Sequence, residues 1–265
     1  MRLTTHVGGL GVLGPGLANW PGTAAVLSGR RNYRAEPTVL SMPMILAAAE
    51  RRRVGRVVKL ALSVALEAVS QAGEDPAELA AVFSSSGGDG HNCHELCQAL
   101  SLSTREVSPT RFANSVHNAA AGYWSIGTGA MAASNVLCAF DASFCAGLLE
   151  AMTHVTVDQV PVLLVAYDSE YPQPLHAKRP IPDAFGVALV LTPQRRPSSL
   201  ARLQADLSAL DFDRFEDRDL EGLRRAFPAA RSLPLLRLLA SGGGGGAVLE
   251  YLDVSRMAVQ IQPCA

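Results

Sequence analysis

The chain has 265 residues, of which 48% are hydrophobic, and its formal net charge is −1. A chain of this length can bury a full core, and its near-zero charge argues against general binding to nucleic acid or to an anionic membrane surface. No apolar stretch reaches the ~18 uninterrupted residues of a membrane-spanning helix. The five cysteines are scattered and odd in number, which favours a reduced, cytoplasmic protein without a disulfide framework.

Strands and helices alternate in the first half of the chain. The predicted elements are, in order, a strand at 5–13, a loop with short structured pieces at 14–42, a helix at 43–71, a strand at 79–84, a glycine-rich loop at 85–90 and a helix at 94–100. The long helix has an apolar face at 3.6-residue spacing, and Gly73 is a plausible stop for it.

The alternation continues beyond residue 100. The predicted elements are a helix at 119–133, a strand at 135–140, a helix at 142–153, strands at 161–167 and 185–191, a broken helix at 220–239, a five-glycine hinge at 242–246 and a hairpin at 247–261. This order predicts a single α/β domain, spanning residues 1–265, with a mostly parallel sheet covered by helices.

Three local patterns have a functional and a structural interpretation. Gly9 to Gly14 matches the dinucleotide pattern G-x-G-x-x-G, but the nearby prolines oppose a helix there, so a glycine-rich strand exit is favoured. The cluster His91, Cys93, His94 and Cys97 has zinc-binding side chains, yet its spacing is cramped for a tetrahedral site, and packing is favoured. The basic run of residues 51–59 indicates either a solvated face or a docking patch for an acidic partner.

A nucleophilic cysteine is the natural candidate for covalent chemistry, with His117 or His154 as its base. Cys138 lies inside a predicted apolar strand, and Cys145 lies inside the following predicted helix. Neither thiol is expected at the strand-to-helix turn, where a nucleophile would be exposed and activated. That position belongs to Asp141, whose carboxylate is expected to cap the amides of the next helix.

Five stretches, in order and spacing, resemble β-ketoacyl synthases, and together they cover roughly residues 5–192. They are Val7–Gly11, Leu60–Gly73, Ser85–Gly88, Ser108–Gly122 and Phe185–Leu191, of which Ser108–Gly122 (SPTRFANSVHNAAAG) is the most specific. The resemblance implies a thiolase-like half-domain with a mixed five-stranded sheet covered by helices. Residues from about 193 to 265 would form a divergent C-terminal extension.

The resemblance also implies a departure from catalysis. Counting forward from Gly122 places the family's catalytic cysteine at Asp141, and a carboxylate cannot form the thioester of a Claisen condensation. The family's two C-terminal histidines have no counterpart here, since no histidine follows His176. The chain therefore resembles the stand-alone, synthase-like proteins described as chain length factors of aryl polyene and polyketide clusters, which implies a non-catalytic role.

The same resemblance implies where a partner and a substrate would bind. The family's strand before the nucleophile pairs across the dimer interface, which here implies an interface at Ser134, Val136, Leu137, Cys138 and Phe140. The acyl pocket would be shaped by Phe112, His117 and Asn118. A core position for Phe112 is an equally good interpretation.

Two functions remain open. The first is a subunit that pairs with a full β-ketoacyl-ACP synthase in fatty-acid, polyketide or aryl-polyene-type elongation, or with itself when that partner is absent. An acyl carrier protein would supply the phosphopantetheine, with no cofactor or metal of the chain's own. The second is a stand-alone thioesterase or decarboxylase that uses Asp141 and His117.

Overall fold

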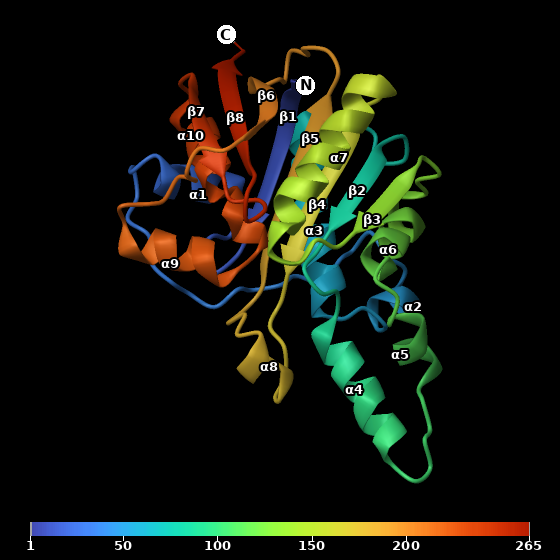
Figure 1. Cartoon of the computed structure of the whole chain (residues 1–265). Coiled ribbons are helices and arrows are strands. Elements are labelled where there is room, and N and C mark those ends of the chain that lie inside the picture. The colour runs from blue at the N-terminus through green and yellow to red at the C-terminus, as the bar shows by residue number, and fades with distance from the viewer. Residues whose placement is uncertain (1, 265) are drawn as a thin grey trace.

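The computed structural model describes residues 2–264, in which one mixed sheet of eight strands runs through the whole molecule (Figure 1). The sheet order is β3-β2-β4-β5-β1-β6-β8-β7. The strands are β1 (Leu3–Leu13), β2 (Ala80–Ser84), β3 (Ser134–Leu137), β4 (Val162–Asp168), β5 (Phe185–Thr192), β6 (Ala201–Ser208), β7 (Gly245–Leu249) and β8 (Arg256–Pro263). Strands β2, β3 and β4 are mutually parallel, and every other pairing is antiparallel.

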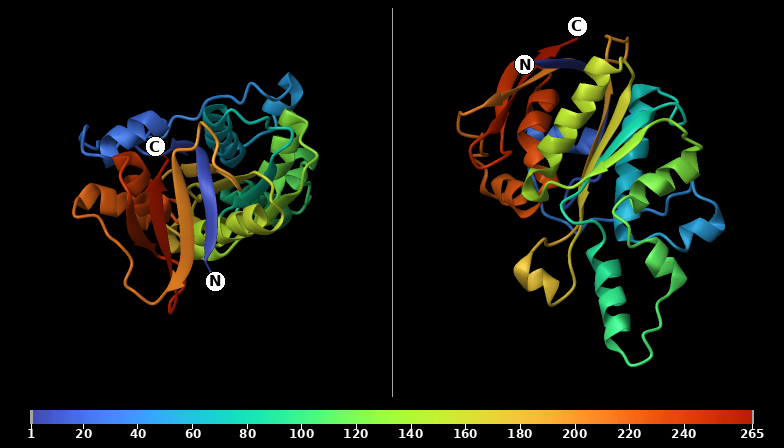
Figure 2. Two further views of the ribbon diagram at one scale, coloured as in Figure 1. Left: turned by 90° about the horizontal axis from the view of Figure 1, so that it is seen from above. Right: turned by 45° about the vertical axis from the view of Figure 1, so that its right-hand side comes forward.

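Helices cover both faces of this sheet (Figures 1 and 2). They are α1 (Trp20–Leu27), α2 (Ala48–Arg51), α3 (Arg56–Ala72), α4 (Gly90–Ser101), α5 (Pro109–Ala113), α6 (Ala119–Thr128), α7 (Ser143–Val157), α8 (Leu175–Lys178), α9 (Arg218–Ala226) and α10 (Leu233–Ser241), with 3-10 turns η1 (Phe140–Ala142) and η2 (Ala229–Ser232). One apolar core joins the sheet to α1, α7 and α10, and a second joins it to α3 and α6. No helix within residues 2–264 has the length and apolar character that crossing a membrane requires.

Close packing of α3 on β1 explains the glycine pattern near the N-terminus. A Cβ atom at Gly9 would lie 2.1 Å from the carbonyl oxygen of Ala68, and one at Gly11 would lie 2.0 Å from that of Val64. Both positions therefore require glycine, because the helix backbone occupies the space of a side chain. No helix starts directly after this pattern, since β1 continues to Leu13, which agrees with a strand rather than a dinucleotide site.

Two predicted helices are shorter than expected. The stretch 43–71 forms two helices, α2 and α3, because the chain is extended at Gly55, directly before α3 begins at Arg56. Helix α6 ends at Thr128 rather than Ala133, because Gly129 takes a left-handed conformation (φ 73°) that closes the helix. Helix α3 ends as predicted, with Gly73 left-handed at its end.

The prediction of a mixed sheet covered by helices is confirmed, but the number of strands is larger than expected. The expectation of a mostly parallel sheet is wrong, because among the described strands only the β2–β3 and β2–β4 pairings are parallel. The five strands β3-β2-β4-β5-β1 come from residues 3–192, and β6, β8 and β7 of the C-terminal extension continue the same sheet beyond β1. Strand β6 falls in a region where no element was predicted. The extension is thus built into the sheet and does not form a separate layer.

Candidate functional site

The connection between β3 and α7 forms a tight elbow. Strand β3 ends at Leu137, so the expected strand over 135–140 is wrong in its second half. The backbone then turns through η1, where Phe140 has a left-handed conformation (φ 51°) that is uncommon for a bulky residue. Ser143 holds this turn: its Oγ accepts from the Ala139 amide (3.0 Å) and donates to the Phe140 carbonyl oxygen (2.7 Å). Strain of this kind is typical of functional turns.

Asp141 lies in this elbow and is held by two arginines. Its Oδ1 accepts from Arg179, which follows α8, and its Oδ2 accepts from Arg231 of η2 (3.1 Å). The Arg179 guanidinium also lies 3.9 Å from the centroid of the Phe140 ring. The expected role of Asp141 as a helix cap is wrong, because α7 has no side-chain cap and the carboxylate binds arginines instead. No local sequence signal connects these residues, which are 38 and 90 positions apart.

The ion pairs continue from Asp141 into the C-terminal extension. Arg231 also lies 3.4 Å from Glu250, which follows β7, and Glu250 in turn lies 2.7 Å from Arg224 of α9. Arg224 is buried and also binds the carboxylate of Glu221, in addition to that of Glu250. Hydrogen bonds from Arg224 lower the pKa of Glu221. The network ties the elbow, α9, η2 and the end of β7 into one unit.

His117 belongs to a different arrangement. Its Nε2 lies 3.1 Å from the Oγ of Ser85, which also accepts from the Gly88 amide (3.1 Å). Burial lowers the pKa of His117, so the imidazole is neutral at pH 7. His117 lines a small enclosed cavity, whereas Asp141 lines a separate, larger and more open cavity with Arg179. Within residues 2–264, no hydrogen bond or ion pair joins His117 to Asp141, the two residues that a stand-alone enzyme would use.

The two candidate thiols occupy unlike environments. Cys138 is exposed and follows β3 rather than lying within it, so the expectation of a strand position is wrong. Its Sγ donates to the Ser86 carbonyl oxygen (3.2 Å). Cys145 lies in α7, as predicted. It is buried, and burial raises the pKa of its thiol, which makes it an inert packing group.

A buried carboxylate lies behind the elbow, at the end of β4. Asp168 accepts from the Ser86 amide (2.9 Å) and from the Ala229 amide of η2 (2.8 Å). Complete burial raises its pKa from 3.8 to about 6, although these hydrogen bonds favour the ionised form. Asp168 therefore connects the glycine-rich loop at 85–90 to the C-terminal extension. Above about pH 6 its buried carboxylate is ionised, which lowers the stability of the folded state.

The raised pKa of Asp168 predicts a specific pH dependence. The folded state binds the proton more tightly than the unfolded state, so stability falls as the pH rises from about 4 to about 6 and then levels off. We expect the unfolding free energy of the wild type, relative to Asp168→Asn, to fall by about 2–3 kcal/mol over this range. Urea unfolding of both proteins from about pH 4 to about pH 7 measures this difference. Identical pH profiles would show that Asp168 is ionised at no cost.

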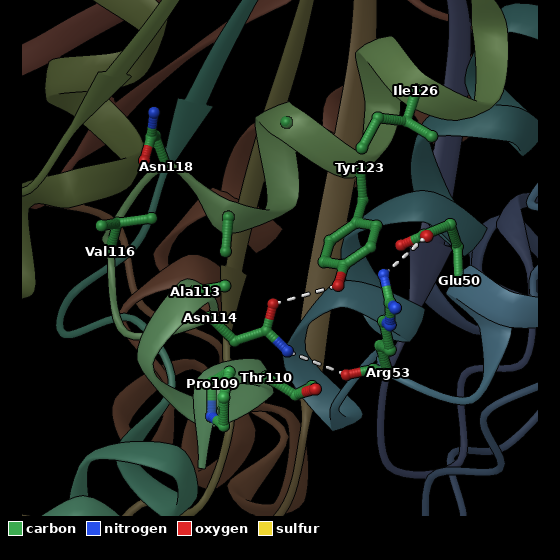
Figure 3. Close-up of a pocket in the computed structure, with 12 residues that line it drawn as sticks. Glu50, Arg53, Pro109, Thr110, Ala113, Asn114, Val116, Asn118, Tyr123 and Ile126 are labelled. Carbon is green, nitrogen blue, oxygen red and sulfur yellow. Dashed lines mark hydrogen bonds and ion pairs between the residues drawn. The ribbon is translucent and has the colours of Figure 1, made fainter. Parts of the chain in front are cut away.

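A groove lies between α2, α5 and α6 and contains one of the predicted pocket residues (Figure 3). Its volume is about 470 Å³, and Asn118, Val116 and Ile126 are among the lining residues. Tyr123 donates to the Asn114 side chain (3.1 Å), whose amide nitrogen donates to the Arg53 carbonyl oxygen (2.8 Å). These hydrogen bonds hold the Tyr123 and Asn114 side chains in place along the groove.

Phe112 is 70% exposed on α5, so the interpretation as a core residue is wrong. It does not line the groove beside it. The structure thus separates the three predicted pocket residues: Phe112 is on the surface, Asn118 is in the open groove, and His117 faces the enclosed cavity.

The basic run of residues 51–59 is mostly engaged within the chain. Arg53 pairs with Glu50 (3.0 Å), and Arg56 pairs with Glu170 (2.7 Å). Arg52 is exposed. A docking role for the run stays a prediction, and these internal pairs favour the structural interpretation for most of it.

The His91–Cys97 cluster lies on α4, a helix that extends beyond the sheet together with α5 (Figure 2). Within residues 2–264, no group of three or more potential ligands is arranged to hold a metal ion. We expect protein purified without added metal to contain no stoichiometric zinc, as measured by elemental analysis. About one zinc per chain, lost in His94→Ala, would contradict this prediction.

Comparison with known proteins identifies the family. Residues 20–224 match the family model described as beta-ketoacyl synthase, N-terminal domain. The chain belongs to this family. No curated protein sequence matches the chain. The β-ketoacyl synthase resemblance of the sequence is thereby confirmed, and Asp141 lies within the matched residues.

Solved structures share the fold across the full chain. A chain from the complex of the ketosynthase ApeO with its chain length factor ApeC, from Xenorhabdus doucetiae, is 24% identical with a TM-score of 0.73, over 97% of this chain and 99% of that chain. A chain of the ishigamide ketosynthase/chain length factor is 14% identical with a TM-score of 0.73, over 99% and 100%. A chain of AntDE:AntF, a type II PKS acyl-carrier protein in complex with its ketosynthase bound to the hexaketide, is 11% identical with a TM-score of 0.75, over 100% of both. These likenesses confirm the thiolase-like fold.

Proposed function

We propose that this β-ketoacyl synthase family member is a non-catalytic, chain-length-factor-like subunit of a complete β-ketoacyl-ACP synthase in fatty-acid, polyketide or aryl-polyene-type elongation. The observation that carries the proposal is the elbow, where Asp141 stands at the position inferred for the nucleophile and is bound by Arg179 and Arg231. A carboxylate that neutralises two guanidinium groups is neither a thioester-forming nucleophile nor a free base. The ApeO–ApeC and ishigamide structures, which contain chain length factors, support this interpretation.

The free edge of β3 supports pairing with a second protein. The carbonyl oxygens of Ala133 and Leu137 accept from β2, so the alternation of a strand directs the backbone groups of Val136 toward the opposite side. Within residues 2–264, no strand pairs with that side. An unpaired strand of this kind is a template for association, and native proteins usually cover it. Isologous pairing would give a homodimer when the synthase is absent.

Exposed apolar side chains lie on the segments around this edge. Helix α6 leads directly into β3, and Figures 1 and 2 show both on one side of the molecule. The exposed fractions in these segments are 70% for Phe112, 53% for Val116, 61% for Ile126, 93% for Met131 and 61% for Phe140. Several large apolar groups in neighbouring segments are typical of an interaction surface rather than of a monomer. We call these five residues the apolar face.

An acyl carrier protein and a cytoplasmic location complete the proposal. AntDE:AntF is described as an acyl-carrier protein in complex with its ketosynthase, which supports a carrier that brings the phosphopantetheine group. The free cysteines support a reducing compartment. The stand-alone enzyme gains no support from the geometry, because Asp141 and His117 line different cavities.

Co-expression with a complete β-ketoacyl-ACP synthase from the same organism tests the proposal. We expect a stable heterodimer and a change in the length or the rate of the synthase products when the chain is present. The isolated chain, and its Asp141→Cys variant, should not extend an acyl group from a malonyl carrier, because within residues 2–264 no histidine is bonded to Asp141. Identical products with and without the chain would refute the subunit role, and extension by either isolated protein would refute the non-catalytic role.

A further inference from the structure

Three arginines from three separate segments line one cavity beside the elbow. Arg179 follows α8, Arg225 belongs to the last turn of α9, and Arg231 belongs to η2. The cavity has a volume of about 380 Å³, which lies within the range of small-molecule sites. Asp141 is the only acidic residue among its described lining residues. The lining therefore has more positive than negative groups.

The three arginines differ in how many of their N–H donors form hydrogen bonds or ion pairs. Arg179 and Arg231 bind the carboxylate of Asp141, and Arg231 lies 3.4 Å from Glu250. The Nε of Arg231 is buried without a hydrogen-bond partner, so this donor is not open to a ligand in the cavity. Arg225 is exposed, with no ion pair or hydrogen bond from its side chain among the described contacts. Arg225 thus has free donors at the cavity, whereas Arg179 and Arg231 use donors on Asp141.

The other walls are apolar. Pro180, Ile181, Ala226 and Pro228 line the cavity together with the arginines. An arginine cluster recognises planar or tetrahedral oxyanions through paired N–H donors. The apolar walls would bury the body of a ligand whose anionic head meets the guanidinium groups.

We propose that this cavity binds a small organic anion with a carboxylate or phosphate head and a short apolar body, and that Asp141 is a built-in competitor for the head group. The Asp141 carboxylate already occupies donors of Arg179 and Arg231, so an external anion has Arg225 and only the remaining donors. Removal of the Asp141 charge frees both guanidinium groups for the ligand. The cavity forms from one chain, so its binding is measured without the synthase and separately from the subunit role.

Titration of the purified full chain with inorganic phosphate, acetate and octanoate at low salt tests this proposal by calorimetry or NMR. We expect wild-type affinity for each head group in the millimolar range or weaker, and at least ~10-fold tighter binding in Asp141→Asn. Octanoate should bind at least ~10-fold more tightly than acetate, because the apolar walls add burial. Equal affinity for acetate and octanoate would refute the apolar body of the ligand.

A pair of arginine variants on one helix provides the matched comparison. Arg225→Gln should weaken octanoate binding at least ~5-fold, whereas Arg218→Gln should leave it unchanged. Arg218 is exposed at the start of α9, about 10 Å along the helix from Arg225, and does not line the cavity. Both residues are exposed, so these variants remain informative if Asp141→Asn does not fold. Equal losses in the two variants, or no gain of affinity in a folded Asp141→Asn, would overturn the proposal.

Discussion

Ile126→Glu is expected to weaken association with the ketosynthase at least ~100-fold. In the proposed complex, Ile126 of the apolar face would be covered, and an unpaired carboxylate buried there costs about 3 kcal/mol or more. The side chain is 61% exposed in the single chain, so the substitution should leave its folding intact. Affinity is measured by co-purification and by titration of the labelled subunits.

The choice of Ile126 over the β3 residues follows from packing. Leu137 is partly buried against the main core, so a charge at that position would disturb the fold and the interface together. Val254→Glu is the matched control, because Val254 is 87% exposed in the turn between β7 and β8, at the opposite end of the sheet order. It should bind the synthase like the wild type. Equal binding of the synthase by Ile126→Glu and Val254→Glu would show that the apolar face is not part of the interface.

Asp141→Ala is expected to lower the unfolding free energy by about 2–3 kcal/mol and the melting temperature by roughly 5–10 °C. The reason is that Arg179 loses the carboxylate it binds and Arg231 keeps only Glu250, while the two arginine side chains are just 22% and 14% exposed. A largely buried guanidinium group without its counter-ion destabilises the folded state, because the cost of its desolvation is no longer offset. The Asp141 side chain is 34% exposed, which keeps the loss below that of a fully buried pair. Calorimetry and urea unfolding measure both quantities.

Two controls separate this effect from a general loss of negative charge. Asp253 is exposed in the β7–β8 turn, and Asp253→Ala should change stability by no more than about 0.5 kcal/mol. The double variant Asp141→Ala with Arg179→Ala should lose less than the sum of the single variants, by about 1 kcal/mol or more, since these residues contact each other. Additive losses would mean that the ion pair contributes nothing to stability.

Several elements could be predicted because their signals are local. The apolar face of α3 repeats at helical spacing, and the continuous apolar run of β5 is buried along its whole length. Strand β6 carried a usable signal too, because Ala201, Leu203 and Ala205 alternate with polar residues. This alternation is typical of a half-buried strand.

For the elbow, the position of Asp141 could be predicted from the sequence, but its contacts could not. The order of motifs in the sequence was enough to assign Asp141 to the position between a strand and a helix, and the left-handed turn at Phe140 lies one residue before it. The partners of its carboxylate were not predictable, because Arg179 and Arg231 lie 38 and 90 residues away and reach it only through the tertiary packing. The same holds for Asp168, which meets the Ala229 amide 61 residues away.

The sequence by itself determined the alternation of strands and helices, the glycines that admit α3 against β1, and the absence of a thiol at residue 141. Only the tertiary structure decided that the C-terminal extension continues the sheet, that Phe112 is exposed, and that Asp141 and His117 line separate cavities. Hydrophobic periodicity and turn residues act over a few neighbouring positions, so a single sequence displays them directly. Strand partners and ion pairs join residues that are distant along the chain, and the packing of the whole core selects them.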